Sequence, residues 1–472
     1  MPSLKINTTA ADIDFAEIRR ELGLPEGYPA PAVAEAVRVA EQQPSAPRDA
    51  TDVPFVTIDP FGAKDLDQAV HLATSRDGGF VVHYAIADVA GYVRPGGDID
   101  VESLMRGQTF YSPDVITPLH PVELSEGAAS LLPGQTRAAV LWTISLDAAG
   151  APVDVQLERA LVRSVAQFDY QGVQADTEAG RLHPSIGLLP AVGRVRMQAA
   201  RERHAITLDV PDAEVLRGPD ANWTLELRAV LPVEQWNAEI SLLTGMCAAQ
   251  IMIDGRYGLL RTLPQPDARS IAKLRRETAA LGIPWPDGTP PGDVIAALDG
   301  SRAADAAFLQ DALKLLRGAG YTPFDGDPPR DDGHAGVGAP YAHVTAPLRR
   351  LGDRFATEIC LAHTAGRPVP DWVRQQLPAV AEIMQKSDRT AHDLERQCRG
   401  AVSAFLLAGR EGQRFTGVVV QIDDQRDRAT IAIDEPPVQA HCERAGLTEG
   451  TSVTVELVSA DARNYVVRPV AG

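Results

Sequence analysis

The stretch TIDPFGAKDLDQAV, residues 57–70, carries three closely spaced aspartates. We expect a strand to deliver Asp59, a Pro/Gly turn to reverse the chain, and Asp65 and Asp67 to point the same way where the segment is extended. Crowded anions are costly unless a cation neutralises them, and hard oxygen ligands favour Mg²⁺ or Mn²⁺ over zinc. The stretch therefore predicts a divalent-metal site of the kind that activates water for phosphodiester hydrolysis.

An exposed turn is the alternative for the same stretch. Aspartates gather in turns because their side chains accept local backbone hydrogen bonds, so the pattern taken alone leaves both interpretations open. A calcium loop of the EF-hand type is disfavoured, because the glycine and the terminal glutamate that such a loop requires are absent at the right offsets.

The composition is that of a globular protein with room for roughly two to four domains. Of the 472 residues, 44% are hydrophobic and 23% charged, and no apolar run is long enough to span a bilayer. The first residues, MPSLKINTTAADIDF, lack the features of a secretory signal, so we expect a cytoplasmic protein. Nothing indicates a membrane partner or an obligate protein partner. The cysteines form no C-x-x-C pair and predict buried thiols: Cys247, Cys360, Cys398 and Cys442.

The net charge of −18 is unusual for a protein that binds nucleic acid, because such proteins commonly present a basic face. Net charge does not reveal its distribution. Basic residues cluster at 273–276 and at Arg349-Arg350, so the sequence allows a basic channel inside an acidic shell.

The order of the patterns predicts an α+β multidomain protein. Residues 1–50 contain two helical segments, 14–22 and 31–43, which suggest either a helix-turn-helix-like domain or a two-helix cap on the next domain. Residues 51–408 begin with alternating strands and continue with long helices. Residues 409–472 return to short strands and predict a small barrel of the oligonucleotide-binding type, or a generic β-barrel. The strands expected before the helices are 55–59, 68–74, 80–89, 138–147 and 153–164.

Four blocks in order along the chain resemble the RNB family of exoribonucleases, the ribonuclease II and ribonuclease R type. The first is residues 57–70, and HYAIADVAGYV at 83–93 resembles the next strand of that family. RGQTFYSPDVITPLHPVELSEGAASLLPG at 106–134 and PYAHVTAPLRRLGDR at 340–354 resemble its later motifs. The C-terminal barrel resembles an S1 domain. The resemblance extends from Asp52 to the end of the chain, and it implies a short form without the family's N-terminal cold-shock barrels.

The resemblance implies a processive 3′-to-5′ hydrolase that threads single-stranded RNA to a metal site and releases nucleoside 5′-monophosphates. It implies Mg²⁺ or Mn²⁺ as cofactor and single-stranded RNA as partner. Two alternatives stay open: a catalytically degenerate protein that binds RNA 3′ ends, and a DNA-binding regulator that uses the N-terminal helix pair.

The resemblance also assigns roles to individual residues. Asp59, Asp65 and Asp67 match the first three aspartates of the family's acidic quartet and become predicted catalytic residues and metal ligands. Gln68 stands at the fourth position, where its amide oxygen can ligate a metal but brings no negative charge. Arg349 matches the arginine that contacts the scissile phosphate, a role suited to its planar donor fork.

The predicted RNA contacts are less sharply defined. Tyr111 matches an aromatic residue that stacks on terminal bases, although a core position is the alternative. The other predicted RNA contacts, less certain because their surroundings diverge from the family, are Tyr170, Glu239, Arg350 and Glu395. For His343 and Thr345 a structural role is expected.

Overall fold

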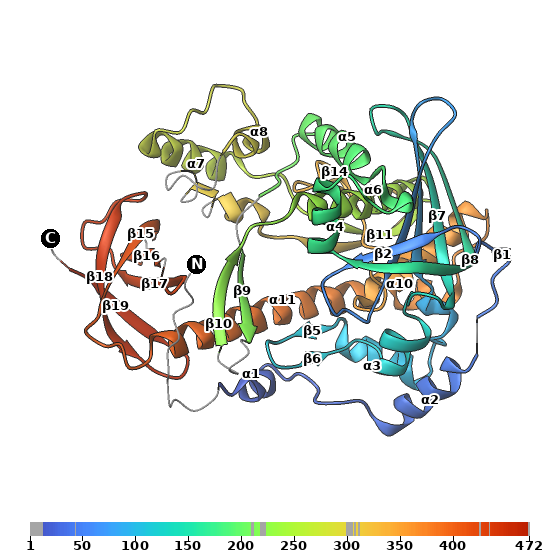
Figure 1. Ribbon diagram of the computed structural model, residues 1–472, viewed down its shortest axis with the longest axis horizontal. Coiled ribbons are helices and arrows are strands. Elements are labelled where there is room, and N and C mark those ends of the chain that lie inside the picture. Colours follow the sequence, from blue (N-terminus) through green and yellow to red (C-terminus); the bar gives the residue numbers. More distant parts are fainter. Residues whose placement is uncertain are drawn as a thin grey trace.

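The computed structural model describes most of the chain, in segments separated by short gaps. Figure 1 shows a large α/β body at one end and a small barrel at the other, with one long helix, α11 (Asp371–Leu407), running between them. The described segments are residues 13–42, 44–208, 212–217, 223–298, 305, 308–309, 312–423, 426–433 and 435–470.

A six-stranded sheet forms the centre of the large body. Its order is β1-β8-β2-β3-β4-β7, and β7 also pairs with β8, so the sheet closes on itself. Strands β2 and β8 run parallel, whereas β2, β3, β4 and β7 are antiparallel neighbours. All five predicted strands are present, which confirms this part of the α+β prediction. The bounds are β1 (Arg48–Asp49), β2 (Phe55–Asp59), β3 (Gln68–Thr74), β4 (Phe80–Ala87), β7 (Thr136–Leu146) and β8 (Pro152–Asp169).

Helices α6 (Pro232–Asp254) and α10 (Leu351–Thr364) bury the sheet's main hydrophobic cluster. Trp142 of the sheet and Phe355 of α10 are both fully buried in it. The remaining elements are α3 (Asp98–Arg106), β5 (Phe110–Tyr111), β6 (Ile116–Thr117), α4 (Tyr170–Glu178), α5 (Leu189–Glu202), β9 (Asp212–Arg217), β10 (Trp223–Arg228), β11 (Tyr257–Thr262), α7 (Ala268–Leu281), α8 (Pro291–Ala296), β12 (Gly320–Asp325), β13 (Gly333–His334), β14 (Ala339–Pro340), and the short helical turns η1 (Val89–Gly91), η2 (Leu124–Ala128), η3 (Pro184–Ile186) and η4 (Leu313–Leu316).

Helix α11 connects the two ends of the molecule because it belongs to two hydrophobic clusters. Leu377 and Met384, in its first half, pack in the cluster beneath the sheet. Leu394 and Val402, in its second half, pack in the cluster of the C-terminal barrel. Burial at both ends of α11 therefore helps to fix the barrel to the large body.

The C-terminal barrel has five antiparallel strands in the order β17-β16-β15-β18-β19. The Tyr465 hydroxyl of β19 donates to the Gln439 carbonyl of β17 at 2.6 Å, so the two edge strands meet and the barrel is nearly closed. This confirms the predicted barrel. The strands are β15 (Arg414–Asp423), β16 (Arg428–Ile433), β17 (Val438–Glu443), β18 (Ser452–Ala460) and β19 (Tyr465–Pro469).

The two predicted N-terminal helices form, as α1 (Phe15–Glu21) and α2 (Ala30–Ala40), but they pack on different parts of the molecule. Phe15 lies in the cluster shared by α11 and the barrel, whereas Val39 lies in a cluster with η1 and η2. The two helices therefore belong to different hydrophobic clusters, and a helix-turn-helix-like domain over residues 1–50 stays a prediction. Residues 1–12 lie outside the described segments.

Two further predictions are open to comparison with the structure. The four cysteines are buried and unpaired, as expected. None of the helices in the described segments has the length and apolar character that a membrane crossing requires.

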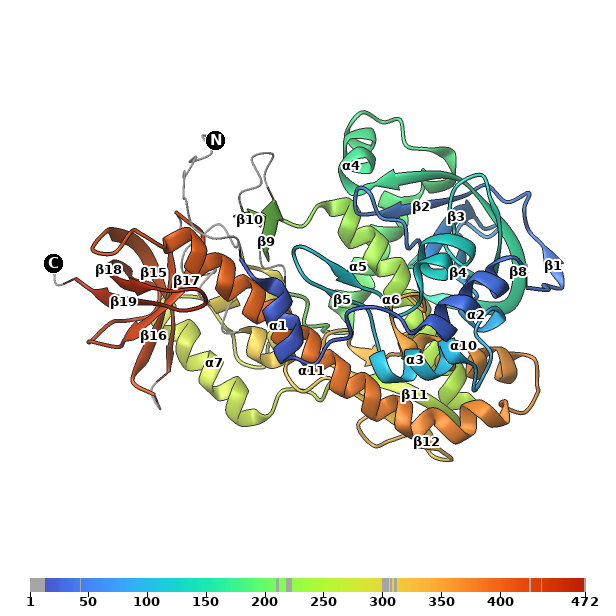
Figure 2. The ribbon, with the colours of Figure 1, turned by 90° about the horizontal axis from the view of Figure 1, so that it is seen from below.

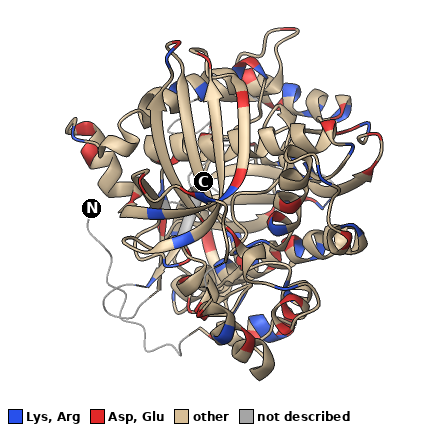
Figure 3. Ribbon diagram, turned by 90° about the vertical axis from the view of Figure 1, so that its right-hand side faces the viewer, with Lys and Arg blue, Asp and Glu red and all other residues tan. Residues whose placement is uncertain are grey.

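Figure 3 shows residues of both charges interspersed over the end of the molecule that carries the sheet.

A buried ion pair joins α3 to α10. The Arg354 guanidinium donates to the Asp100 carboxylate and, at 3.0 Å, to the Val93 carbonyl. The side chains of Arg354 and Asp100 are 1% and 0% exposed. A charge this deeply buried depends on its partner, because water cannot replace the lost interaction.

Asp100→Ala is expected to lower the free energy of unfolding by about 3–5 kcal/mol, because it leaves the Arg354 guanidinium buried without its counter-ion. Urea unfolding followed by tryptophan fluorescence measures the change. The control is Asp98→Ala, at an exposed position on the same helix, where we expect a change within about 0.5 kcal/mol. Equal stability of the two variants would contradict the importance of the pair.

Candidate active site

The acidic cluster lies where β2 ends and β3 begins. Asp59 is the last residue of β2, Gln68 is the first of β3, and the loop between them carries Asp65 and Asp67. Since β2 and β3 are antiparallel neighbours, with Val56 opposite Val70, the end of one strand and the start of the other lie at the same edge of the sheet. The predicted strand, turn and second strand therefore form as expected.

Burial acts on all three aspartates, and the charge of Asp65 adds to it at Asp59 and Asp67. Burial and the charge of Asp65 raise the pKa of Asp59 to about 7, against the opposing effect of Arg349. Burial also raises the pKa of Asp65 and, well above its usual range, that of Asp67. A raised pKa means that the carboxyl group holds its proton more tightly, because its negative charge is poorly compensated. The three aspartates therefore lack sufficient positive charge around them.

The donors present fit a hard divalent cation. All three are carboxylates, and the buried Oδ2 of Asp59 has no hydrogen-bond partner within the described residues. Within the same described segments, however, no three His, Cys, Asp or Glu residues are already arranged as a metal-binding group. The carboxylates thus fit the predicted metal in their chemistry. Their arrangement does not by itself form a complete coordination shell.

Asp67 joins the cluster to the segment 343–350, far away in the sequence. The Leu348 backbone N–H donates to Asp67 Oδ1 at 2.8 Å, and Arg349 Nε lies 3.9 Å from Asp67 Oδ2. The Arg349 side chain is 46% exposed, while that of Asp67 is 6% exposed. The structure thus brings Arg349 to the aspartates, with part of its guanidinium accessible to a ligand.

Backbone hydrogen bonds hold the Arg349 segment in place. The Ala346 N–H donates to Asp353 Oδ1 at 2.7 Å, and the Thr109 N–H donates to the Arg349 carbonyl at 2.9 Å. Gly107 has a φ of +77°, and a Cβ there would meet Ser387 Oγ of α11 at 2.7 Å. Only glycine allows this close approach, which explains the Arg-Gly pair at the start of the 106–134 block.

Arg350 is committed to a protein partner. Its Nε and Nη2 donate to the two carboxylate oxygens of Asp353 at 3.0 and 2.9 Å. Burial lowers the pKa of Arg350, but the Asp353 charge outweighs burial and the net shift is upward. The Arg350–Asp353 pair therefore stabilises the segment that carries Arg349. An RNA contact of Arg350 stays a prediction.

Gln68, the substituted fourth position, has protein partners at both ends of its amide. Its Nε2 donates to the Thr345 carbonyl at 2.7 Å, and its Oε1 accepts from the hydroxyl of the buried Tyr84. Thr345 Oγ1 in turn lies 2.7 Å from Ser241 Oγ of α6. Gln68 thus ties β3 to the segment that carries Arg349, and one lone pair of its oxygen is already used.

Tyr111 projects from the β5–β6 hairpin beside the aspartates. Tyr111 is 49% exposed, and its hydroxyl lies close enough to the Asp65 carboxylate to act on the pKa of that group. Burial, followed by the charge of Asp65, raises the pKa of Tyr111. The core alternative for Tyr111 is therefore wrong, because half of the ring remains open to a ligand.

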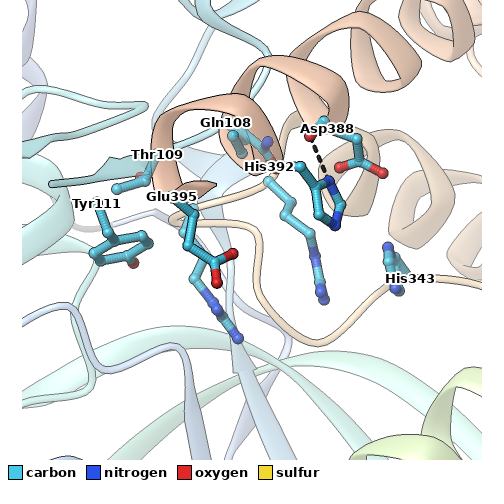
Figure 4. Close-up of a pocket in the computed structure, with 10 residues that line it drawn as sticks. Gln108, Thr109, Tyr111, His343, Asp388, His392 and Glu395 are labelled. Atoms are coloured by element: carbon cyan, nitrogen blue, oxygen red, sulfur yellow. Dashed lines mark hydrogen bonds between the residues drawn. The ribbon is translucent and has the colours of Figure 1, made fainter. Parts of the chain in front are cut away.

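A cavity of about 400 Å³ opens next to Tyr111 and Arg349. Figure 4 shows Tyr111 and Glu395 at one side of it and His343 at the other, with α11 forming the upper wall. Its lining residues come from three separate parts of the chain: Gln108, Thr109, Tyr111, His343, Arg349, Arg350, Asp388, Ala391, His392 and Glu395. Of these, Gln108, Thr109, Asp388 and His392 were not identified from the sequence, because they have no signal apart from their position in the fold.

Two other predicted RNA contacts lie near the site. Tyr170 begins α4 directly after Asp169, the partner of Asp59 in the β2–β8 ladder. Burial and then the charge of Asp59 raise the pKa of Tyr170. Glu395 lies on α11 at the cavity wall, where it accepts from Arg399 at 2.6 Å.

Glu239 is not brought to the cavity. It is 8% exposed on α6, and the charges that act on it are those of Arg196 and Arg203. On a helix, residues two apart point to nearly opposite faces. Because Ser241 bonds to Thr345 of the Arg349 segment, Glu239 faces the packing between α5 and α6 instead. His343 shows the expected structural bonding, with Nδ1 2.8 Å from the Tyr321 hydroxyl.

Known families match both parts of this architecture. Residues 47–363 match the RNB domain, and residues 413–468 match the RNase II-type exonuclease C-terminal S1 domain. The chain belongs to the RNB family, whose exoribonucleases generally depend on divalent metal ions.

The chain is similar to ribonuclease R of Escherichia coli, with 28% identity over 415 residues that make up 81% of this chain and 50% of the relative. It spans about half the length of several such curated relatives. Its fold is similar to that of Mycoplasma genitalium RNase R in complex with ribose methylated single-stranded RNA, at a TM-score of 0.86, 20% identity and coverage of 97% and 78% of the two chains. It is also similar to yeast Ssd1, described as a pseudonuclease, at a TM-score of 0.73, 17% identity and coverage of 94% and 58%.

Proposed function

We propose that this chain is an exoribonuclease that hydrolyses single-stranded RNA processively from the 3′ end and releases nucleoside 5′-monophosphates. The observation that carries the proposal is the meeting of buried Asp67 with half-exposed Arg349, 3.9 Å apart, beside a cavity lined by Tyr111. Carboxylates and a guanidinium at one point are the groups that phosphodiester hydrolysis requires on the two sides of the reacting phosphate.

Asp59, Asp65 and Asp67 are the residues we propose to hold Mg²⁺ or Mn²⁺. The unpartnered Oδ2 of Asp59 and the raised pKa of each carboxyl group support a cation among them. When bound, such an ion neutralises the carboxylates, activates a water molecule and offsets charge on the leaving oxygen.

Arg349 supplies donors for the phosphoryl oxygens. Its backbone is set by the Leu348–Asp67 bond and by the Thr109 bond to its carbonyl, so its side chain needs little rearrangement to meet a substrate. Donors that are already oriented stabilise developing negative charge more effectively than mobile ones. We propose that Arg349 acts in this way on the scissile phosphate.

The substrate is proposed to be RNA read without regard to base identity. The exposed half of the Tyr111 ring supports stacking on a terminal base, which any base satisfies. Glu395, exposed at the cavity wall, offers an acceptor for a ribose 2′-hydroxyl. We propose that residues 51–408 form the catalytic domain and that residues 409–472 form the S1 barrel, which provides a second RNA-binding surface. We also propose that the protein is located in the cytoplasm.

A catalytically degenerate RNA-binding protein is the second candidate. One observation favours it: Gln68 replaces an acidic residue, and both ends of its amide already bond to protein. The similarity of fold to Ssd1 is compatible with this candidate, because that structure is described as a pseudonuclease.

A uniform oligoadenylate labelled at its 5′ end and incubated with Mg²⁺ separates the two candidates. The enzyme is expected to release mononucleotides while leaving few products of intermediate length, the pattern of processive 3′-to-5′ hydrolysis. Retention of the intact RNA on the protein without products would establish the binding protein instead. Label released first as a mononucleotide would refute the proposed direction.

Asp67→Asn is expected to reduce turnover by at least about a thousandfold, roughly 4 kcal/mol of transition-state stabilisation, because it removes ligand charge. RNA affinity is expected to change little, since the amide oxygen still accepts from the Leu348 N–H. Single-turnover assays and fluorescence anisotropy measure the two quantities. Asp77→Asn, in the exposed β3–β4 turn, is the matched control and should retain full activity.

Gln68→Asp is expected to lower the metal concentration for half-maximal rate by about three- to tenfold, because it adds a carboxylate to the cluster. Metal titration of the cleavage rate measures this. Gln68→Leu, which removes both hydrogen bonds of the amide without adding charge, controls for the lost hydrogen bonds. An unchanged metal dependence in Gln68→Asp would mean that position 68 connects β3 to the Arg349 segment without ligating the ion.

A further inference from the structure

Helix α1 touches two parts of the molecule that both lie on the proposed RNA path. Figure 2 shows it lying across α11, between the C-terminal barrel and β5. Its apolar side is anchored there: Phe15 and Ile18 are buried in the cluster that contains Leu394 of α11. Phe15 also meets Trp223 of β10 edge-on, with ring centroids 5.1 Å apart.

The first ionic contact of α1 is with the barrel. Arg463, in the turn between β18 and β19, donates to Glu21 at 2.5 Å and to Glu17 at 2.6 Å. Glu17 and Glu21 are four residues apart and therefore share one face of the helix. The turn itself is ordered by Asp461, whose Oδ1 accepts from the backbone N–H groups of Arg463 and Asn464.

The second ionic contact is with the hairpin that carries Tyr111. Arg19 donates to both carboxylate oxygens of Asp114, at 2.5 and 3.0 Å, and to Ser112 Oγ at 2.7 Å. The Arg19 side chain is only 13% exposed, so this contact is better shielded from water than that of Arg463, at 28%. A two-pronged arginine contact restrains orientation as well as distance.

The segment that follows α1 is fixed to the far end of the same hairpin. The Tyr28 hydroxyl donates to the Pro118 carbonyl at 2.6 Å, and the Arg106 guanidinium lies 3.8 Å from the centre of the Tyr28 ring. The chain from Phe15 to Tyr28 thus contacts the barrel, α11 and both ends of the β5–β6 hairpin.

We propose that α1 is a positioning element that couples the S1 barrel to the Tyr111 hairpin, through Glu17 and Glu21 on one side and Arg19 on the other. The inference rests on the proposed function only in taking the barrel and Tyr111 as RNA contacts. The barrel contact increases the affinity for long RNA by holding the barrel in line with the cavity, through Arg463, Glu17 and Glu21. Arg19 acts through Tyr111 by holding its hairpin.

The test of the barrel contact uses charge reversal and restoration. Arg463→Glu places three acidic groups together, and it is expected to weaken the binding of an RNA of about 25 nucleotides by roughly three- to tenfold, in keeping with the modest strength of exposed ion pairs. A trinucleotide is shorter than the roughly 4–16 nucleotides that an OB-fold site covers, so we expect its affinity to depend on the cavity and to stay within about twofold. Fluorescence anisotropy with EDTA present measures both affinities without cleavage.

The triple variant Glu17→Arg, Glu21→Arg, Arg463→Glu restores opposite charges with their positions exchanged. It is expected to return the affinity for the long RNA to within about twofold of the unmodified chain. If the affinity stays low, Arg463 contacts RNA directly and the proposal fails. Equal losses for the long and the short RNA, or no loss for either, would also overturn it.

A double-mutant cycle tests the hairpin contact. If Arg19 acts through Tyr111, the effects of Arg19→Ala and Tyr111→Ala on trinucleotide affinity should be non-additive, with Arg19→Ala adding less than about twofold in the Tyr111→Ala background. Additive effects would contradict the coupling. Because these measurements need no cleavage, absence of released nucleotides from the unmodified chain would refute the proposed exoribonuclease and leave this comparison intact.

Discussion

The repulsion among Asp59, Asp65 and Asp67 at the junction of β2 and β3 is the constraint on which the remaining architecture depends. Burial raises the pKa of each carboxyl group, so every nearby source of positive potential stabilises the cluster. The protein supplies two such sources from the distant segment 343–350: the Leu348 N–H and the Arg349 guanidinium. The same interactions that stabilise the fold at this point place the Arg349 guanidinium beside the acidic residues.

The Arg349 segment must itself be held in place, and this requirement explains two residues that have no evident chemical role, Asp353 and Gly107. The Asp353 carboxylate accepts hydrogen bonds from the Ala346 backbone N–H and from Nε and Nη2 of Arg350. One buried carboxylate thus fixes the Arg349 segment at two points. Gly107 lets the 106–134 block approach α11, and two residues later the Thr109 N–H donates to the Arg349 carbonyl. The motif residues therefore divide into those whose side chains reach the cavity, such as Arg349, and those that fix the backbone, such as Asp353 and Gly107.

The sequence predicted those parts of the structure that local patterns encode. Alternating apolar residues identified the strands, and the spacing of Asp65 and Asp67 after a Pro/Gly turn identified the acidic cluster. Contacts between distant segments were beyond reach. The partners of Gln68 come from β4 and from position 345, and only the folded chain brings them together. The placement of Glu239 was beyond reach for a related reason, because an isolated α6 pattern does not say which side of the helix faces the site.

The two N-terminal helices illustrate a further limit. Their lengths and the Pro/Gly break between them suggest a pair that packs together, yet each finds a larger apolar surface elsewhere. For α1 that surface is α11, which extends from beneath the sheet to the barrel. A single helix restrains the distance between its ends but leaves rotation about its axis less restrained. Contacts that lie off the helix axis, such as those of Arg463 and Arg19 with their partners, restrain this rotation and thereby orient the barrel relative to the cavity.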